Sequence, residues 1–208
     1  MKKTTLWFIL VLCIGVAGYA VFSYAVLTPG TTVAPAMKAT YQEHKVTILL
    51  HVFFSAIALV TGPFQFFPSI RKRRGIHRKI GYVYFTSVFV GGLAGLAMSF
   101  IAYGGLVSKI GFGSLAVLWL YTAVMALLAI QKKLYAQHEV WAIRCFALTF
   151  SAVTLRLYLG LFFASGLSFD TFYPALSWLC WVPNILFVEW FFLRITTEPN
   201  KTPAPSQL

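Results

Sequence analysis

Long apolar runs separated by short polar breaks make up most of the 208-residue chain. A helix needs roughly 20 residues, at about 1.5 Å each, to cross a hydrocarbon core of about 30 Å. Runs of this kind lie at residues 5–27, 46–67, 80–103, 110–130, 139–165 and 173–194. The pattern predicts an all-α helical bundle of about six transmembrane helices, in a single transmembrane domain over residues 1–195. Residues 196–208 contain three prolines and are expected to form a disordered tail.

The composition agrees with a chain that is embedded in a lipid bilayer. Hydrophobic residues make up 59% of the sequence and charged residues only 11%, whereas a soluble domain is roughly 45–50% apolar and about 25% charged. The net charge of +12 is typical of nucleic-acid binding in a soluble protein. In a membrane protein the same residues mark cytoplasmic loops, so no nucleic-acid partner is expected. The three cysteines are isolated in apolar runs and predict neither a disulfide framework nor a zinc site.

The basic residues also predict the direction of the helices. If six helices alternate, residues 2–3, 71–79, 132–133 and 194–201 fall on one side, and only three lysines fall on the other: Lys38, Lys45 and Lys109. The positive-inside rule then places both termini in the cytoplasm. Contacts with anionic lipid headgroups are expected at Arg71, Lys72, Arg73 and Arg74. The first run resembles a signal peptide, but it continues to Leu27, which favours an uncleaved anchor.

Ionisable residues inside the apolar runs are the default functional candidates, because they are costly in hydrocarbon and face a bundle interior or a cavity. His51 in the second run and Arg156 in the fifth are predicted at similar levels in the outer half of the membrane. His77 and His138 are predicted at the cytoplasmic boundary. Arg144 and Glu189 are expected on the inner side as a structural ion pair. His138 and Arg156 are five helical turns apart and so share a face of one continuous helix.

These positions favour binding of a small ligand or redox cofactor within the bundle. His77 and His138 are candidate axial ligands for the iron of a haem b, and a quinone site is the other redox option. His51 and Arg156 are candidates for lining a polar ligand site. The alternative for His77 and His138 is a helix cap or headgroup contact. Whole-protein alternatives are an accessory subunit with other membrane-protein partners, or a proton or small-solute transporter. The chain contains no nucleophile elbow, HExxH, P-loop or dinucleotide motif, so no catalytic residues are assigned.

Several stretches resemble a known family. They are GPFQF at 62–66, HRKIGYVY at 77–84, the glycines at 91, 92 and 95, and ALTFSAVTLRLY at 147–158. Together, over roughly residues 45–195, the chain resembles the bacterial membrane-protein family catalogued as domain of unknown function 2306. The resemblance implies a multi-pass protein of the bacterial cytoplasmic (inner) membrane. It also marks His51, His77, His138, Arg144 and Arg156 as matched motif positions, and it implies no activity.

Overall fold

The computed structural model describes residues 3–27 and 35–193, which are mostly helical and contain no strand. Within them, six helices are long and apolar enough to cross a membrane. They span Lys3–Tyr24, Lys45–Phe66, Arg74–Ser99, Gly105–Gln131, Tyr135–Ala164 and Phe169–Leu193. The predicted all-α membrane bundle with six spans is therefore confirmed. The predicted tail, 196–208, lies outside the described residues.

The α-helices are α1 (Lys3–Val21), α2 (Lys38–Glu43), α3 (Lys45–Thr61), α4 (Pro68–Lys72), α5 (Arg74–Ser99), α6 (Gly105–Gln131), α7 (Tyr135–Thr149), α8 (Ser151–Ala164), α9 (Phe169–Leu179) and α10 (Val182–Phe187). Four shorter helical segments complete the described chain: the π-helices η1 (Phe22–Val26) and η4 (Val188–Leu193), and the 3-10 helices η2 (Pro35–Met37) and η3 (Pro63–Phe66). Because their backbone groups bond within each helix, these segments suit a medium that contains no water.

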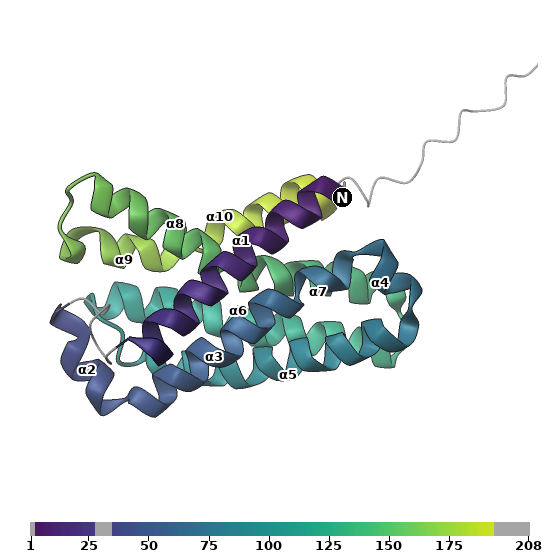
Figure 1. Ribbon diagram of the computed structural model, residues 1–208, viewed down its shortest axis with the longest axis horizontal. Helices are drawn as coiled ribbons and strands as arrows, with labels where there is room; N and C mark the ends of the chain where they lie inside the picture. The colour runs from purple at the N-terminus through teal and green to yellow at the C-terminus, as the bar shows by residue number, and fades with distance from the viewer. Residues whose placement is uncertain (1–2, 28–34, 194–208) are drawn as a thin grey trace, which may run out of the picture.

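Helices α3, α5, α6 and α7 form the centre of the bundle, and α1 lies across α3 (Figure 1). Glycine brings α3 and α5 close together. A Cβ at Gly91 would lie 3.2 Å from the backbone nitrogen of Ser55, and one at Gly95 would lie 2.8 Å from the His51 ring. The GxxxG pair therefore lets two helix backbones approach and leaves space for an imidazole between them.

The fifth span is broken in mid-membrane. α7 ends at Thr149 and α8 begins at Ser151. The Thr149 hydroxyl donates to the Cys145 carbonyl (2.9 Å), and the Ser151 hydroxyl donates to the Leu148 carbonyl (2.5 Å). Hydroxyls bonded to the preceding turn compete with the helix's own hydrogen bonds and bend it. The expectation of one continuous helix with a shared face from His138 to beyond Thr149 was therefore wrong, because the helix is interrupted at Phe150.

The sixth span is broken at a matching place. α9 ends at Leu179 and α10 begins at Val182, followed by Pro183, which has no N–H to continue the helix. Asn184 joins the two breaks, since its Nδ2 donates to the Thr154 hydroxyl (2.9 Å) and to the Cys180 carbonyl (3.2 Å). As a result α8 packs on α9 at one end of the molecule, while α10 packs on α7 toward the other (Figure 1).

Candidate functional site

Three polar side chains from three elements gather at the end of the bundle that carries α4. Gln65 lies on η3, His77 on the first turn of α5 and His138 on the first turn of α7. A Cβ at Gly81 would lie 3.5 Å from Gln65 Oε1, so the amide packs on bare helix backbone. His77 and His138 are close enough for their charges to interact. We call Gln65, His77 and His138 the α4-end cluster.

Two polar nitrogens of this cluster are buried and have no hydrogen-bond partner in the described part of the chain: Gln65 Nε2 and His77 Nδ1. By contrast, His138 Nδ1 lies 2.9 Å from the Ala126 carbonyl oxygen, to which it donates. That bond fixes the tautomer of His138 and leaves its Nε2 available to another group. Because buried polar atoms are nearly always bonded, the two unpartnered nitrogens mark this place as a candidate ligand site.

An ion pair covers the surface beside the α4-end cluster. The two terminal guanidinium nitrogens of Arg71, Nη1 and Nη2, donate to the Glu139 carboxylate, each at 2.9 Å, and so tie α4 to the start of α7. Both side chains are about half exposed, so the pair adds little to stability, on the order of 0–1 kcal/mol. The pair instead fixes positions, because it holds α7, which carries His138, against α4, which directly precedes the helix that carries His77.

The structure also brings Arg144 and Glu189 together. The guanidinium binds the carboxylate in a bidentate manner, with Nε–Oε1 at 2.5 Å and Nη2–Oε2 at 3.0 Å, and it lies 4.5 Å from the centre of the Trp141 ring. Glu189 is on the π-helix η4, so this pair connects the fifth and sixth spans on the side of the breaks where α7 and α10 pack. Both charges are matched within the protein, which fits a structural role.

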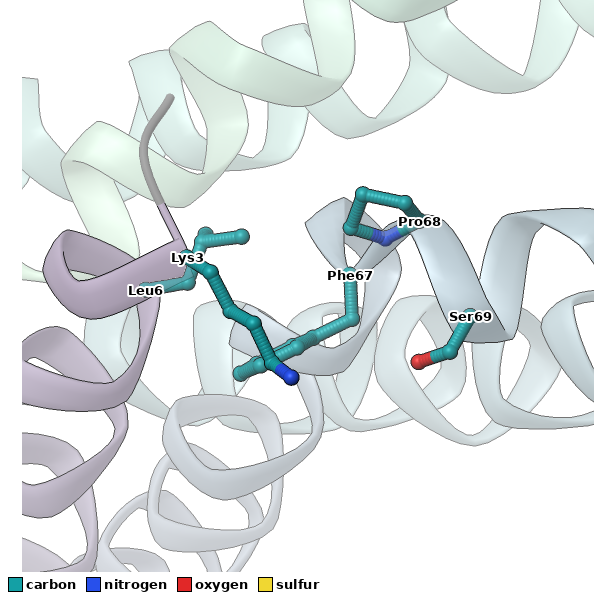
Figure 2. A pocket seen from close by; sticks show the side chains of 5 residues that line it. All are labelled: Lys3, Leu6, Phe67, Pro68 and Ser69. Carbon is teal, nitrogen blue, oxygen red and sulfur yellow. The ribbon is translucent and has the colours of Figure 1, made fainter.

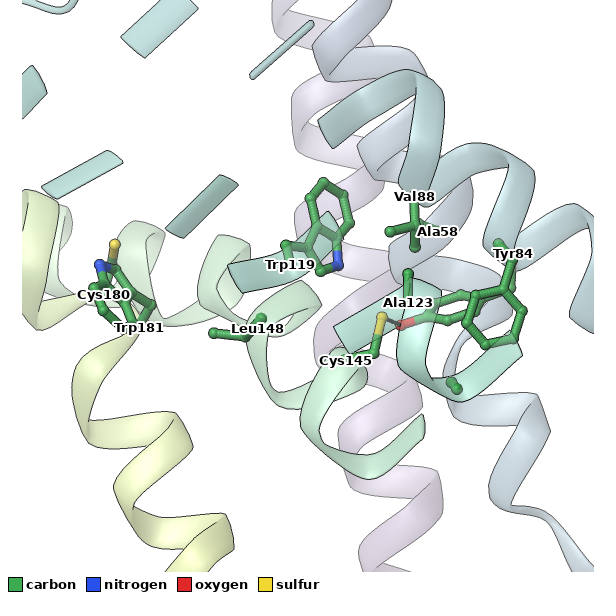
Figure 3. Packing of buried hydrophobic residues seen from close by; sticks show 11 residues of the cluster. Ala58, Tyr84, Val88, Trp119, Ala123, Cys145, Leu148, Cys180 and Trp181 are labelled. Carbon is green, nitrogen blue, oxygen red and sulfur yellow. Dashed lines mark hydrogen bonds between the residues drawn. The ribbon is translucent and has the colours of Figure 1, made fainter. Parts of the chain in front are cut away.

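A hydrogen-bond network that the sequence did not reveal lies at the centre of the bundle. Thr149, at the break in the fifth span, accepts from the Trp119 indole (2.9 Å) and bonds the Tyr84 hydroxyl (2.8 Å). All three side chains are buried. Figure 3 shows the Tyr84 hydroxyl directed toward Cys145, whose Sγ lies 3.3 Å from it and is a second, weaker acceptor for the same proton. This network joins α5, α6 and α7 and separates the α4-end cluster from the opposite end.

His51 and Arg156 lie toward the end that carries α2, α8 and α9. His51 Nδ1 is 2.8 Å from the Gly91 carbonyl oxygen. The Arg156 guanidinium carbon lies 5.4 Å from the centre of the Tyr19 ring on α1. α1 contacts both α3, which carries His51, and α8, which carries Arg156. The two residues interact electrostatically but form no hydrogen bond with each other.

A small cavity of about 220 Å³ opens at the α4 end between α1 and α4 (Figure 2). Lys3 and Leu6 line it from α1, and Phe67, Pro68 and Ser69 line it from the opposite side. Its wall is mostly apolar with a single cation at the rim.

A bundle of six membrane-length helices, with polar groups directed inward, defines a multi-pass α-helical integral membrane protein. The model of the family described as "Predicted membrane protein (DUF2306)" matches residues 48–192. The chain belongs to this family, which confirms the resemblance drawn from its motifs. No curated protein and no solved structure matches the chain.

Proposed function

We propose that the protein binds a lipid-soluble redox molecule of the quinone class at the α4-end cluster. The observation that carries the proposal is the pair of buried, unpartnered nitrogens, Gln65 Nε2 and His77 Nδ1. A quinone carbonyl oxygen accepts hydrogen bonds of the kind these atoms offer. The Phe85 ring lies 6.5 Å from the His138 ring and adds an aromatic surface. A neutral, planar ligand that enters from the bilayer matches a site built from an amide, imidazoles and an aromatic ring.

Haem b is the second candidate, and a specific bond favours it. An imidazole that binds iron through Nε2 usually donates its Nδ1–H to a carbonyl or carboxylate, and His138 has this arrangement with Ala126. His77 would supply the second imidazole from α5. The donor set therefore fits a bis-histidine haem, which would give the protein an electron-transfer centre. The lack of an acceptor for His77 Nδ1 among the described residues makes this fit poorer than that of the quinone.

The test uses the full-length protein purified in nanodiscs. Binding of a short-chain quinone is measured by titration, and absorption spectra are recorded before and after reduction on protein from haem-replete cells. We expect saturable quinone binding that weakens about tenfold in Gln65→Leu and His77→Ala, the effect of losing one hydrogen bond to the ligand. If haem is the ligand, a Soret band shifts on reduction and disappears in His77→Ala and His138→Ala.

A matched control is available in His44→Ala, because His44 is a histidine at the opposite end of α3 from Gln65. This variant should leave both signals unchanged. A featureless spectrum together with no saturable quinone binding would refute the proposal. Equal losses in His44→Ala and His77→Ala would refute the assignment to this site.

We propose further that the protein lies in a bacterial cytoplasmic membrane with both termini in the cytoplasm. Support comes from the exposed basic residues at the α4 end, Arg71, Lys72, Arg73 and Arg74, which fit anionic headgroups. The cavity beside Lys3 supports a lipid contact at the same level. Reporter fusions at each terminus test the orientation. Activity of an externally folding reporter at either terminus would overturn it.

A further inference from the structure

Arg156 carries a charge that the described part of the protein does not balance. None of the four acids in that part forms an ion pair with Arg156: Glu139 binds Arg71, Glu189 binds Arg144, Asp170 accepts a hydrogen bond from Tyr103, and Glu43 lies 4.0 Å from His44. The Arg156 guanidinium lies over the Tyr19 ring. An aromatic ring does not offer the pair of acceptor oxygens that would match the fork of N–H donors on a guanidinium. Arg144, the other arginine inside this span, has both a ring and a carboxylate.

Other hydrogen-bonding groups surround this cation. His51, on α3, is anchored through Nδ1–H at the Gly91 carbonyl. Its Nε2 therefore accepts a hydrogen bond in the neutral ring and donates to an anion only when the ring is protonated. Tyr173, on α9, and Arg156 are close enough to interact electrostatically, and so are Tyr173 and Tyr24. The polar and aromatic groups around Arg156 therefore come from α1, η1, α3 and α9.

An independent observation concerns Tyr41, on α2. Its side chain is only 3% exposed, and its hydroxyl is buried without a hydrogen-bond partner in the described residues. The Tyr41 ring lies 6.0 Å from the Tyr24 ring, which connects it to the groups around Arg156. A buried tyrosine hydroxyl without an acceptor is a hydrogen-bond donor that a ligand can use. We call Tyr24, Tyr41, His51, Arg156 and Tyr173 the α2-end cluster.

We propose that the α2-end cluster binds an oxyanion, a carboxylate or phosphate group, carried either by a lipid-like molecule or by a free ion. A guanidinium matches the geometry of two oxygens on one such group, and tyrosine hydroxyls donate to the remaining oxygens. The ligand supplies the negative charge that the described residues do not, and it removes the cost of an unbalanced cation in the membrane. This site is distinct from the α4-end cluster and does not depend on the function proposed for it.

The experiment measures binding to the full-length protein in nanodiscs. One arm titrates inorganic phosphate against chloride at constant ionic strength. The other replaces part of a phosphatidylcholine bilayer by phosphatidic acid and records lipid retained on the protein by native mass spectrometry. We expect saturable binding in at least one arm. Binding only in the first identifies a free ion, and binding only in the second identifies a lipid headgroup.

Three variants assign the site. Arg156→Gln should weaken binding at least about tenfold, and Tyr41→Phe should weaken it about three- to tenfold, because it removes one donor and leaves the ring in place. Lys109→Gln is the matched control, since it removes an exposed cation near the same end. Tyr41→Phe keeps the test valid if Arg156→Gln does not fold. Absence of saturable binding in both arms, or an equal loss in Lys109→Gln, would overturn the proposal.

Discussion

Replacing Thr149 by valine should destabilise the protein more than any other change of a single hydroxyl to a methyl among the described residues. The substitution keeps the shape of the side chain and removes the oxygen at the break in the fifth span. That oxygen accepts from Trp119 Nε1 at 2.9 Å and bonds the Tyr84 hydroxyl at 2.8 Å. Since Thr149 donates its own proton to the Cys145 carbonyl, both partners act as donors to it.

The magnitude follows from these two donors. Trp119 is 6% exposed and Tyr84 is 2% exposed, so neither gains a water molecule in exchange. Leaving a buried donor unpaired costs about 1–3 kcal/mol, and hydrogen bonds between membrane helices average about 0.6 kcal/mol. Tyr84 retains its weaker contact with Cys145, so the expected loss for Thr149→Val is about 2–3 kcal/mol.

The assay is reversible unfolding in mixed micelles, with Thr61→Val as the control. The Thr61 hydroxyl bonds only to carbonyls of its own helix, at Ile57 and Ala58, so its removal should change the free energy of unfolding by less than about 0.5 kcal/mol. The double variant Tyr84→Phe/Thr149→Val should lose less than the sum of its single variants, because both act on one bond. Equal stability of Thr149→Val and Thr61→Val would refute the reasoning.

Two further predictions concern the end of the molecule that carries α2 and α9. Gly95→Ala should lower the free energy of unfolding by about 1–3 kcal/mol, since its Cβ would lie 2.8 Å from the His51 ring. Gly160→Ala is the control, because a Cβ there meets nothing within 4 Å and should not destabilise the protein. Chemical denaturation of the two variants measures the difference. The hydrogen bond from Tyr103 to Asp170 raises the pKa of Tyr103. Its contribution to stability is therefore complete below the ordinary tyrosine pKa, about 10, and is lost as the pH rises through the raised value. Asp170→Asn should lower the pKa of Tyr103 in a phenolate absorbance titration; an unchanged or higher pKa would contradict this.

The number and class of the helices could be predicted from the sequence because lipid imposes a length on every apolar run. The ends of the runs could be located from single residues such as Pro68 and Gly104, which separate them. The breaks inside the fifth and sixth spans could not be predicted in the same way. Thr149 and Ser151 are compatible with an intact helix in lipid, and whether their hydroxyls bend it depends on partners from other helices.

The candidate sites could be predicted only in part from the sequence, for a similar reason. A histidine or arginine in an apolar run stands out, so His77, His138 and Arg156 could be selected from the sequence. Gln65 and Tyr41 became candidates only when the structure left their buried polar atoms without partners. Such a property depends on every neighbour in space and has no local pattern. Asn184, next to Pro183 in an apolar run, is a signal that could have pointed to the broken span.

The ion pair between Arg144 and Glu189 has a consequence for how the chain enters the membrane. Arg144 belongs to the fifth span and Glu189 to the sixth, so the arginine is synthesised first and reaches the insertion machinery before its counter-charge exists. An arginine at the centre of a span opposes insertion by about 2.5–3.5 kcal/mol, and Arg144, nearer one end of its span, opposes it by less. We therefore expect the fifth span to gain its full preference for the bilayer only when the last helix arrives, so that the two spans enter as a hairpin whose completion depends on the Glu189 carboxylate.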